Sequence, residues 1–322
     1  MDTYDFILDY LFDYTLIQKW PEMKDLLSKA GSKKPRDWQL PVLACKAIGG
    51  DYEQVIQATA SIACLQMSII LVDDMLDGDS HGVHNQMGAP ATANLALAFH
   101  TAGLDVVTRS KAGRGIKFQA LRNLNQMMLT TALGQYMDVQ SPKDEEDYWR
   151  IVRAKSSPFF GSALYIGALM GGATASVALQ IERFGYLYGE MIQIHADLND
   201  TMAVPANSDW TLGRMPLPIL YAHTVDHPEK ARFLELRQAI PDPLALTEAQ
   251  TMLVRIGAVS YCTDQLFRRY HAARKILSTM VLPEKAELES LLEGVVEPVK
   301  NLYAAAGLPP SPALLQPTGI VI

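Results

Sequence analysis

The sequence contains few cysteines and no pattern that would bind a metal through sulfur. Cys45, Cys64 and Cys262 are the only three, and they lie far apart without a Cys-x-x-Cys pair or a partnered histidine. This spacing excludes a disulfide framework and a zinc site, and it is typical of reduced thiols in a protein core. The acidic start, MDTYDFILDY, also lacks the basic segment of a secretory signal peptide. We therefore expect a cytoplasmic protein.

Basic charge and strand-like patterns are equally scarce. The net charge is −7 and no basic stripe is visible, which argues against nucleic acid as a partner. No run alternates apolar and polar residues between turn signals, and no repeat or long linker is present. Because 49% of the residues are apolar, a sizeable core is available. We predict an all-α fold, with residues 1–322 forming a single domain of long helices around a central cavity and residues 308–322 forming an extended, proline-rich tail.

One uncharged run, from Ser156 to Ile181, is long enough to cross a bilayer. It contains many small residues, and Gly171 and Gly172 stand together within it. Two core helices that pack closely and are separated at this glycine pair account for the composition better than a lone membrane span. We expect no transmembrane segment.

A second apolar run, SIACLQMSIILVDDMLDGDS at 61–80, ends abruptly in acid. Twelve uncharged residues are followed by Asp73, Asp74, Asp77 and Asp79. Residues four apart share a helix face, so Asp73 and Asp77 point the same way and repel each other. Oxygen ligands at this spacing suit a hard cation such as Mg²⁺. The alternative is an acidic helix end that is simply solvated.

A similar pattern recurs in GEMIQIHADLNDTMA near residue 190. Asp197 and Asp200 are three residues apart on an apolar helix, and Gln193 lies one turn before Asp197. We expect the two acidic helices to face each other across one cavity, where divalent ions between them would hold an anion.

The acidic runs belong to a longer series of motifs with a recognisable order and spacing. In chain order the series is DDMLD at 73–77, GQYMD at 134–138, Lys155-Ser156, QIHADLND at 193–200, SDWTLGRMPLPILYA at 208–222 and GAVSYCTDQLFRRYHAARKIL at 257–277. Over roughly residues 30–280, this series resembles the trans-isoprenyl diphosphate synthases, or polyprenyl synthetases. The resemblance implies an all-α, Mg²⁺-dependent prenyltransferase of isoprenoid biosynthesis that is a homodimer. Such an enzyme ionises an allylic diphosphate and condenses it with isopentenyl diphosphate.

The resemblance also implies roles for individual residues. Catalytic roles fall to Asp73, Asp77, Lys155 and Gln193, the metal ligands would be Asp73, Asp74, Asp77, Asp197 and Asp200, and the substrate-binding residues would be Gln135, Asp138, Arg214, Lys34 and Arg36. Each of three polar residues also has a plain structural interpretation. Lys155 could extend along the surface, Gln193 could be a buried amide, and Arg214 could be a solvated loop residue.

The sequence departs from the family pattern mainly where isopentenyl diphosphate would bind. An Arg-Arg pair after the first motif corresponds to Gln86 and Met87, and the arginine of a Gly-Lys-x-x-Arg-Pro motif corresponds to Leu40. Gln66 takes the place of a histidine. In the second acidic motif, Ala196 replaces the first aspartate. Glutamine and methionine cannot supply the bidentate bonds of arginine.

Three explanations are consistent with these losses. The enzyme elongates with the basic loop around Lys34 and Arg36 in a different role, or it works as a terpene cyclase or aberrant prenyltransferase without isopentenyl diphosphate, or it is a non-catalytic partner subunit of a prenyl synthase.

Overall fold

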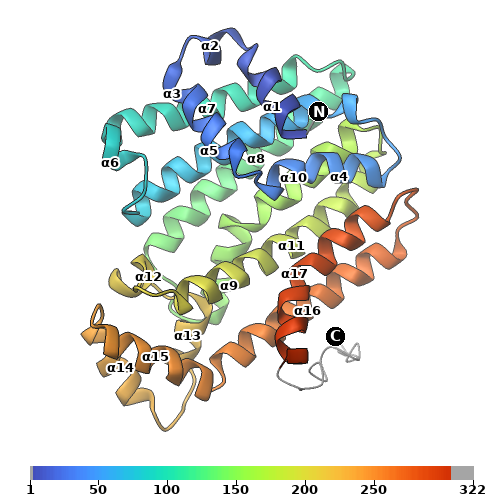
Figure 1. Ribbon diagram of the computed structural model, residues 1–322. Coiled ribbons are helices and arrows are strands. Elements are labelled where there is room, and N and C mark those ends of the chain that lie inside the picture. Colours follow the sequence, from blue (N-terminus) through green and yellow to red (C-terminus); the bar gives the residue numbers. More distant parts are fainter. Residues whose placement is uncertain (1–2, 306–322) are drawn as a thin grey trace. The chain divides into compact units, whose positions relative to one another are not determined.

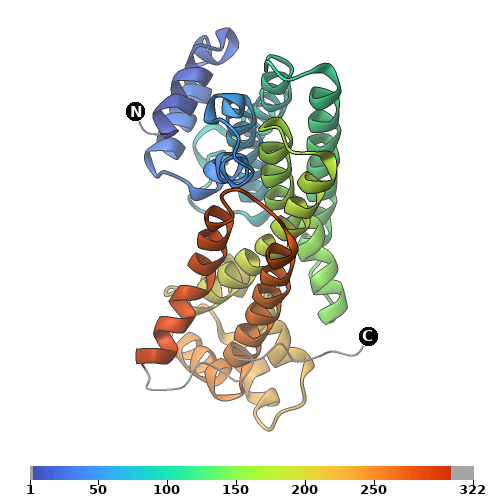
Figure 2. The same ribbon diagram turned by 90° about the vertical axis from the view of Figure 1, so that its right-hand side faces the viewer.

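The computed structural model describes residues 3–305, and within that range every regular element is a helix. Figures 1 and 2 show coiled ribbons throughout the described chain. The prediction of an all-α fold is confirmed. The proposed tail at 308–322 lies outside the described residues.

The chain divides into two compact units, and the prediction of a single domain over 1–322 stays a prediction. Of the described residues, the first unit comprises 3–131, 158–186 and 279–289, and the second comprises 132–157, 187–278 and 290–305. The boundaries fall within long helices as well as between them, because α8 (Arg114–Val139) and α11 (Ala175–Met202) each contribute to both units.

The first unit holds the first acidic motif at the end of a buried helix. Short helices and several long ones make up the unit (Figure 1). In chain order they are α1 (Thr3–Phe12), α2 (Thr15–Gln18), α3 (Pro21–Ser32), η1 (Arg36–Gln39), α4 (Leu40–Ala47), η2 (Tyr52–Gln54), α5 (Ile56–Asp77), α6 (His84–Met87), α7 (Ala89–Thr108) and α10 (Ser157–Met170), with parts of α8 and α11.

The core of the first unit forms where α5 packs against α7. Met67 and Leu71 of α5 join Leu95 and Phe99 of α7 in one buried apolar cluster. Burying side chains of this size stabilises a fold by about 1.5–3 kcal/mol each. Within residues 3–305, α5 is also the one helix that is long and apolar enough to span a membrane, and 61% of its most apolar window is buried inside the protein. A core helix passes that test as readily as a membrane span.

The second unit carries the later motifs. Besides parts of α8 and α11, it contains α9 (Glu145–Lys155), α12 (Ser208–Thr211), α13 (Leu217–Thr224), α14 (Lys230–Ala239), α15 (Pro243–Arg255), α16 (Ala258–Thr279) and most of α17 (Ala286–Ala305). Trp210, Ile219, Phe233 and Leu253 belong to one apolar cluster that joins α12, α13, α14 and α15.

Local signals divide the apolar stretches into separate helices. Residues 4–30 form three helices, and the second break falls at Trp20, which adopts the extended backbone that a following proline favours before α3 starts at Pro21. Residues 247–278 form two helices, separated at Gly257, whose φ of +88° does not fit a helix. Asp51 caps the short helix η2, since its carboxylate accepts a hydrogen bond from the Glu53 amide at 3.2 Å, and α5 starts after η2 at Ile56.

The break expected at Gly171-Gly172 is confirmed. Helix α10 ends at Met170 and α11 begins at Ala175.

Candidate functional site

The first acidic motif occupies the last turns of α5. Asp73, Asp74 and Asp77 are each half-buried, and the helix ends immediately afterwards at Gly78, which adopts a left-handed conformation with φ of +60°. The C-terminal end of a helix already carries partial negative charge, so carboxylates there are unfavourable without a cation. Burial and the neighbouring carboxylates of Asp79 and Asp73 raise the pKa of Asp74 to about 6. This end of α5 therefore has the donor chemistry of a hard divalent cation.

The segment that follows the first motif carries no guanidinium. Gln86 is exposed on α6, while Met87 packs against the apolar core of the first unit. His84 lowers the pKa of Asp74 through its charge, but burial and the carboxylates outweigh this effect. The two positions where the resemblance leads us to expect an arginine pair thus have different environments, one solvated and one apolar.

The basic loop of the first unit holds the other expected anion-binding residues. Lys34 is exposed, has a φ of +50°, and its carbonyl accepts a hydrogen bond from the Tyr4 hydroxyl at 3.0 Å. Arg36 is exposed at the start of η1, and the Leu40 side chain that follows is completely buried. The exposed cationic side chains of this loop, those of Lys33, Lys34 and Arg36, are therefore accessible to an anion.

A polar pair that the sequence did not reveal lies beside this loop. The Gln66 Nε2 of α5 donates a hydrogen bond to the Asp37 Oδ2 of η1 at 2.7 Å. Burial raises the pKa of Asp37, and the bond from Gln66 opposes that rise. Gln66 was singled out in the sequence as the replacement of a histidine, but its partner could not be found from spacing.

The second acidic motif has one deeply buried carboxylate. Asp197 is 5% exposed, and its oxygens accept hydrogen bonds from three donors: Gln193 Nε2, the Tyr148 hydroxyl and the Leu217 amide, each at 2.7 Å. Burial raises the pKa of Asp197 to about 6 even though all three donors lower it. Gln193 in turn accepts a hydrogen bond from the Ser156 hydroxyl. Asp197 is thus the centre of a network that joins α9, α11 and α13.

Tyr148 was not recognised as a site residue in the sequence. It is buried on α9, and it precedes Lys155 by seven residues, or two helical turns. The two side chains therefore share a face of α9. That spacing was a usable signal, although nothing in the sequence identified Asp197 as the partner.

Two cations of the second unit meet at one carboxylate. Lys155 Nζ lies 2.7 Å from Asp138 Oδ2, and Arg214 NH1 lies 3.5 Å from the same oxygen. Arg214 is 9% exposed, so it is a buried side chain and not a solvated loop residue. Lys155 is an ion-pair partner whose side chain is 18% exposed. Both cations predicted to bind diphosphate are brought together.

Asp200 and Asp209 complete the charged cluster of the second unit. Burial raises the pKa of Asp209, and the charges of Asp200 and Asp138 raise it further. Burial also raises the pKa of Asp200. Asp209 belongs to the SDWTLGR stretch that was recognised in the sequence, but no role was assigned to it.

A close contact between α8 and α9 brings the GQYMD motif at 134–138 next to Lys155. A Cβ atom added to Gly134 of α8 would lie 2.2 Å from the backbone nitrogen of Lys155 on α9. Glycine therefore lets the two backbones touch, and it brings the buried Gln135 and the ion-pairing Asp138 next to the end of α9.

A preformed metal site is absent from the described part of the chain. Within residues 3–305 no three side chains of His, Cys, Asp or Glu form a group that could hold a metal ion. Magnesium sites commonly use one or two carboxylates together with substrate phosphates, so the donor set of Asp73 and Asp77 fits Mg²⁺. The two acidic motifs belong to different units, and their facing each other stays a prediction.

Comparison with known proteins identifies similar sequences and folds. The sequence profile of the polyprenyl synthetase family matches residues 18–247. A short chain isoprenyl diphosphate synthase of Methanothermobacter thermautotrophicus is 25% identical over 281 residues, which cover 82% of this chain and 85% of the relative. A nonaprenyl diphosphate synthase of Mycobacterium tuberculosis is 25% identical over 312 residues, 90% of each chain.

The fold is shared with solved structures. The geranylgeranyl pyrophosphate synthetase of Pyrococcus horikoshii superposes with a TM-score of 0.78 at 21% identity, and the match covers 91% of this chain and 95% of that one. At this identity the likeness is one of fold, and the relatives' products differ in length.

Proposed function

The chain belongs to the polyprenyl synthetase family, and from this premise we propose that it is a Mg²⁺-dependent prenyltransferase that ionises an allylic diphosphate and condenses it with isopentenyl diphosphate. The observation that carries the proposal is the presence of two kinds of charged group, one in each unit. Helix α5 ends in carboxylates suited to a divalent cation, and the second unit holds Lys155 and Arg214 beside Asp138.

The metal would be held by Asp73 and Asp77, with Asp74 in support. A bound Mg²⁺ would neutralise the negative charge of the leaving pyrophosphate. Its charge would also favour the ionised form of Asp74, whose pKa burial and neighbouring carboxylates raise. On α11, the helix of the second acidic motif, we propose that Asp200 is a metal ligand.

Asp197 is a proposed metal ligand whose carboxylate is already hydrogen-bonded. It carries three hydrogen bonds in the ligand-free arrangement, so metal ligation by Asp197 requires it to exchange at least one donor for the ion. Gln193 is bonded to the same carboxylate and to Ser156, and its amide would keep Asp197 oriented.

Lys155 and Arg214 would hold the allylic diphosphate. A guanidinium and an ammonium side by side match the charge of a diphosphate, which makes strong charge-assisted bonds with both. Asp138 keeps the two cations together before substrate binds, since they share its Oδ2. Gln135 would contribute from the same helix.

A second function differs from the first in the acceptor of the prenyl group. Gln66, which bonds to Asp37, stands where the resemblance has a histidine, and the exposed Gln86 stands where it has an arginine. These residues favour an enzyme that ionises the allylic diphosphate and then cyclises it or passes it to a different acceptor. Under the first function, Lys34 and Arg36 would bind isopentenyl diphosphate instead.

Product analysis separates the functions. The full chain is incubated with Mg²⁺ and farnesyl diphosphate, with and without isopentenyl diphosphate. A longer isoprenyl diphosphate that forms only when isopentenyl diphosphate is present supports condensation. Pyrophosphate release with a hydrocarbon or alcohol product in its absence supports the second function. No turnover of any allylic diphosphate, together with tight binding of a prenyl synthase chain, supports a non-catalytic subunit.

We also propose a homodimer that works in the cytoplasm. Large apolar side chains are exposed along α8, among them Phe118, Leu129, Leu133 and Tyr136, each at least half exposed. Their spacing of three to four residues, or multiples of it, makes a stripe along one helix that a second copy would cover. Analytical ultracentrifugation checks the dimer, and Leu129→Glu should shift it to monomer.

A further inference from the structure

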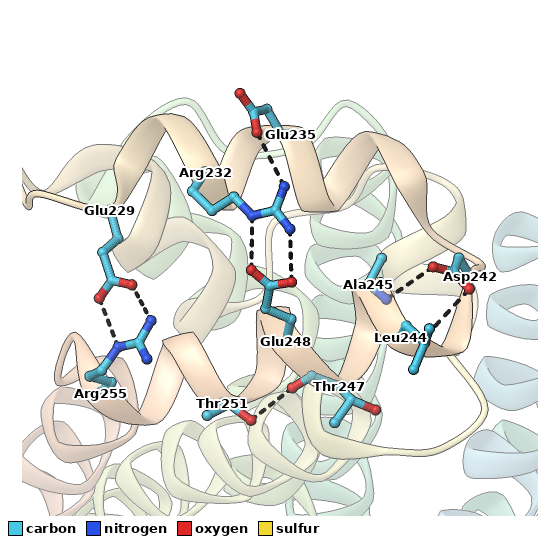
Figure 3. Close-up of polar contacts among 10 residues, drawn as sticks. All are labelled: Glu229, Arg232, Glu235, Asp242, Leu244, Ala245, Thr247, Glu248, Thr251 and Arg255. Atoms are coloured by element: carbon cyan, nitrogen blue, oxygen red, sulfur yellow. Dashed lines mark hydrogen bonds and ion pairs between the residues drawn. The ribbon is translucent and has the colours of Figure 1, made fainter.

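Helices α14 and α15 form a firmly joined pair in the second unit (Figure 3). Arg232 of α14 makes two bonds of 2.8 Å to Glu248 of α15, and Arg255 makes two bonds to Glu229. Asp242 caps the first turn of α15 by accepting from the Ala245 amide at 3.2 Å. Exposed ion pairs contribute only about 0–1 kcal/mol each, so the buried apolar side chains that the two helices share, among them Phe233 and Leu253, do most to hold α14 on α15.

The inner face of α14 packs against the loop that leads from the second acidic motif to Arg214. Phe233 is completely buried, with its ring 6.3 Å from the ring of Trp210 and 5.9 Å from that of His223. Trp210 Nε1 in turn donates a hydrogen bond to the Thr201 carbonyl at 2.9 Å. The loop is therefore held between α11 and α14.

Arg237 of α14 binds the loop next to Arg214. Its NH2 donates to the Arg214 carbonyl at 2.5 Å, and its NH1 lies 3.1 Å from the Met215 sulfur and 2.5 Å from His223 Nε2. Within residues 3–305, no carboxylate forms an ion pair with Arg237. All three partners are neutral, because burial and the charge of Arg237 lower the pKa of His223 to about 4.

This arrangement fixes Arg214 from both sides. The Arg214 amide donates to the Asp209 carbonyl at 2.9 Å, while its carbonyl accepts from Arg237. The side chain between these two bonds reaches Asp138 at 3.5 Å. With both peptide groups held, the Arg214 side chain starts from a fixed backbone position, whether its partner is Asp138 or an anion.

We propose that Arg237 is a positioning residue for Arg214, and that it prepares the loop at 212–216 for a diphosphate. This inference rests on the proposed function for the role of Arg214. Arg237 does not touch the ligand itself.

The test measures binding of inorganic pyrophosphate in the presence of Mg²⁺ by calorimetry on the full chain, without any prenyl substrate. Arg237→Gln should weaken binding by about ten- to a hundredfold, the range expected when a bond from a charged donor is lost. Arg214→Gln should weaken it at least as much. Arg232→Gln, on the same helix but on its exposed face, is the matched control and should bind within about twofold of the wild type.

The double variant tests whether Arg237 acts through Arg214. If it does, Arg214→Gln/Arg237→Gln binds pyrophosphate no more weakly than Arg214→Gln alone. Losses that multiply in the double variant would overturn the proposal, as would wild-type affinity in Arg237→Gln. Wild-type affinity in Arg237→Lys would do the same, since lysine keeps the charge but not the planar fork.

The proposed function can fail separately. A chain that binds Mg²⁺-pyrophosphate but turns over no allylic diphosphate refutes the prenyltransferase and leaves the Arg237 comparison valid. A wild-type chain that binds no pyrophosphate overturns the role of Arg237 as well.

Discussion

The Tyr148 hydroxyl donates a hydrogen bond of 2.7 Å to the Asp197 carboxylate, and both groups are buried. This bond ties α9, which ends at Lys155, to the helix that carries the second acidic motif. The orientation of Lys155 thus depends on a tyrosine two turns away. Burial and the Asp197 charge raise the pKa of Tyr148 well above its usual range, so the hydroxyl stays protonated and remains a donor.

Tyr148→Phe removes this donor without changing the ring. Leaving the buried Asp197 carboxylate without this hydrogen bond costs about 1–3 kcal/mol of stability. The orientation of α9 about its own axis also becomes less well defined. We expect the free energy of unfolding to fall by that amount and kcat/KM for the allylic diphosphate to fall about tenfold. Urea denaturation and steady-state kinetics give the two values.

Tyr261→Phe is the control for this variant. Its hydroxyl also bonds to a carboxylate of the second unit, that of Glu145, but at an exposed site. We expect a change within about 0.5 kcal/mol and unchanged kinetics. Equal effects from the two tyrosines would mean that the link to Asp197 has no special part in the site.

Asp73→Ala should remove most prenyl transfer while making the metal-free protein more stable. Loss of a metal ligand forfeits several kcal/mol of charge stabilisation, and we expect at least a hundredfold drop in kcat, an order-of-magnitude figure. Removing one carboxylate also relieves the repulsion that contributes to the raised pKa of Asp74, so Tm without Mg²⁺ should rise. Asp25→Ala, exposed on α3, should change neither. Full activity of Asp73→Ala would refute the metal assignment.

The acidic end of α5 could be predicted because its signal is local. A long apolar run, an acidic end and a glycine are all visible within twenty or so neighbouring residues, and helical spacing alone puts Asp73 beside Asp77. The small-residue break after Met170 was visible for the same reason.

The partners of the buried polar groups could not be predicted in this way. The bond between Gln66 and Asp37 spans 29 residues and that between Tyr148 and Asp197 spans 49. Such pairs depend on which helix faces which, and on the depth at which each side chain ends up. Arg237 offered no signal at all, because a lone arginine on an amphipathic helix is usually a surface residue.

Gly134→Ala should separate α8 from α9. The new Cβ would lie 2.2 Å from the Lys155 nitrogen and 2.5 Å from the Ala154 carbonyl carbon, and backbone atoms cannot turn aside. Overpacking of this kind costs about 1–3 kcal/mol or more, and it should break the ion pair between Lys155 and Asp138. We expect a lower Tm and a higher KM for the allylic diphosphate.

Gly115→Ala is the matched control in the same helix. Nothing lies within 4 Å of a Cβ built at Gly115, and alanine in a helix is favoured over glycine by about 0.5–1 kcal/mol. Stability should rise slightly with kinetics unchanged. If Gly134→Ala behaves in the same way, the close contact between the helices is wrong.

Gln86→Arg should improve the use of isopentenyl diphosphate. The side chain is exposed on α6, so an arginine there adds a bidentate donor for a diphosphate with little cost to stability. We expect KM for isopentenyl diphosphate to fall about tenfold or more, in line with a charged hydrogen bond. Adding Met87→Arg should lower KM further, but at a cost in stability, because Met87 packs on the core. An unchanged KM in both variants would mean that this loop does not meet the acceptor.

His223 should make the protein sensitive to mild acid. Burial, Arg237 and Lys230 lower the pKa of His223 from an ordinary 6.5 to about 4 in the folded state. Between those two values the unfolded chain binds more protons than the folded one, so stability is complete above about pH 6.5 and is lost as the pH falls toward 4. Because the ring is only half-buried, we expect the loss of stability to be about 1–2 kcal/mol and not the full value of the pKa shift.

His223→Gln is the control, because glutamine keeps an acceptor for Arg237 but cannot titrate. Comparing the two proteins cancels the contribution of the carboxylates that titrate in the same pH range. Urea denaturation from about pH 7 to about pH 4.5 should show the wild type losing stability relative to His223→Gln. Parallel pH profiles for the two proteins would mean that Arg237 does not keep His223 neutral.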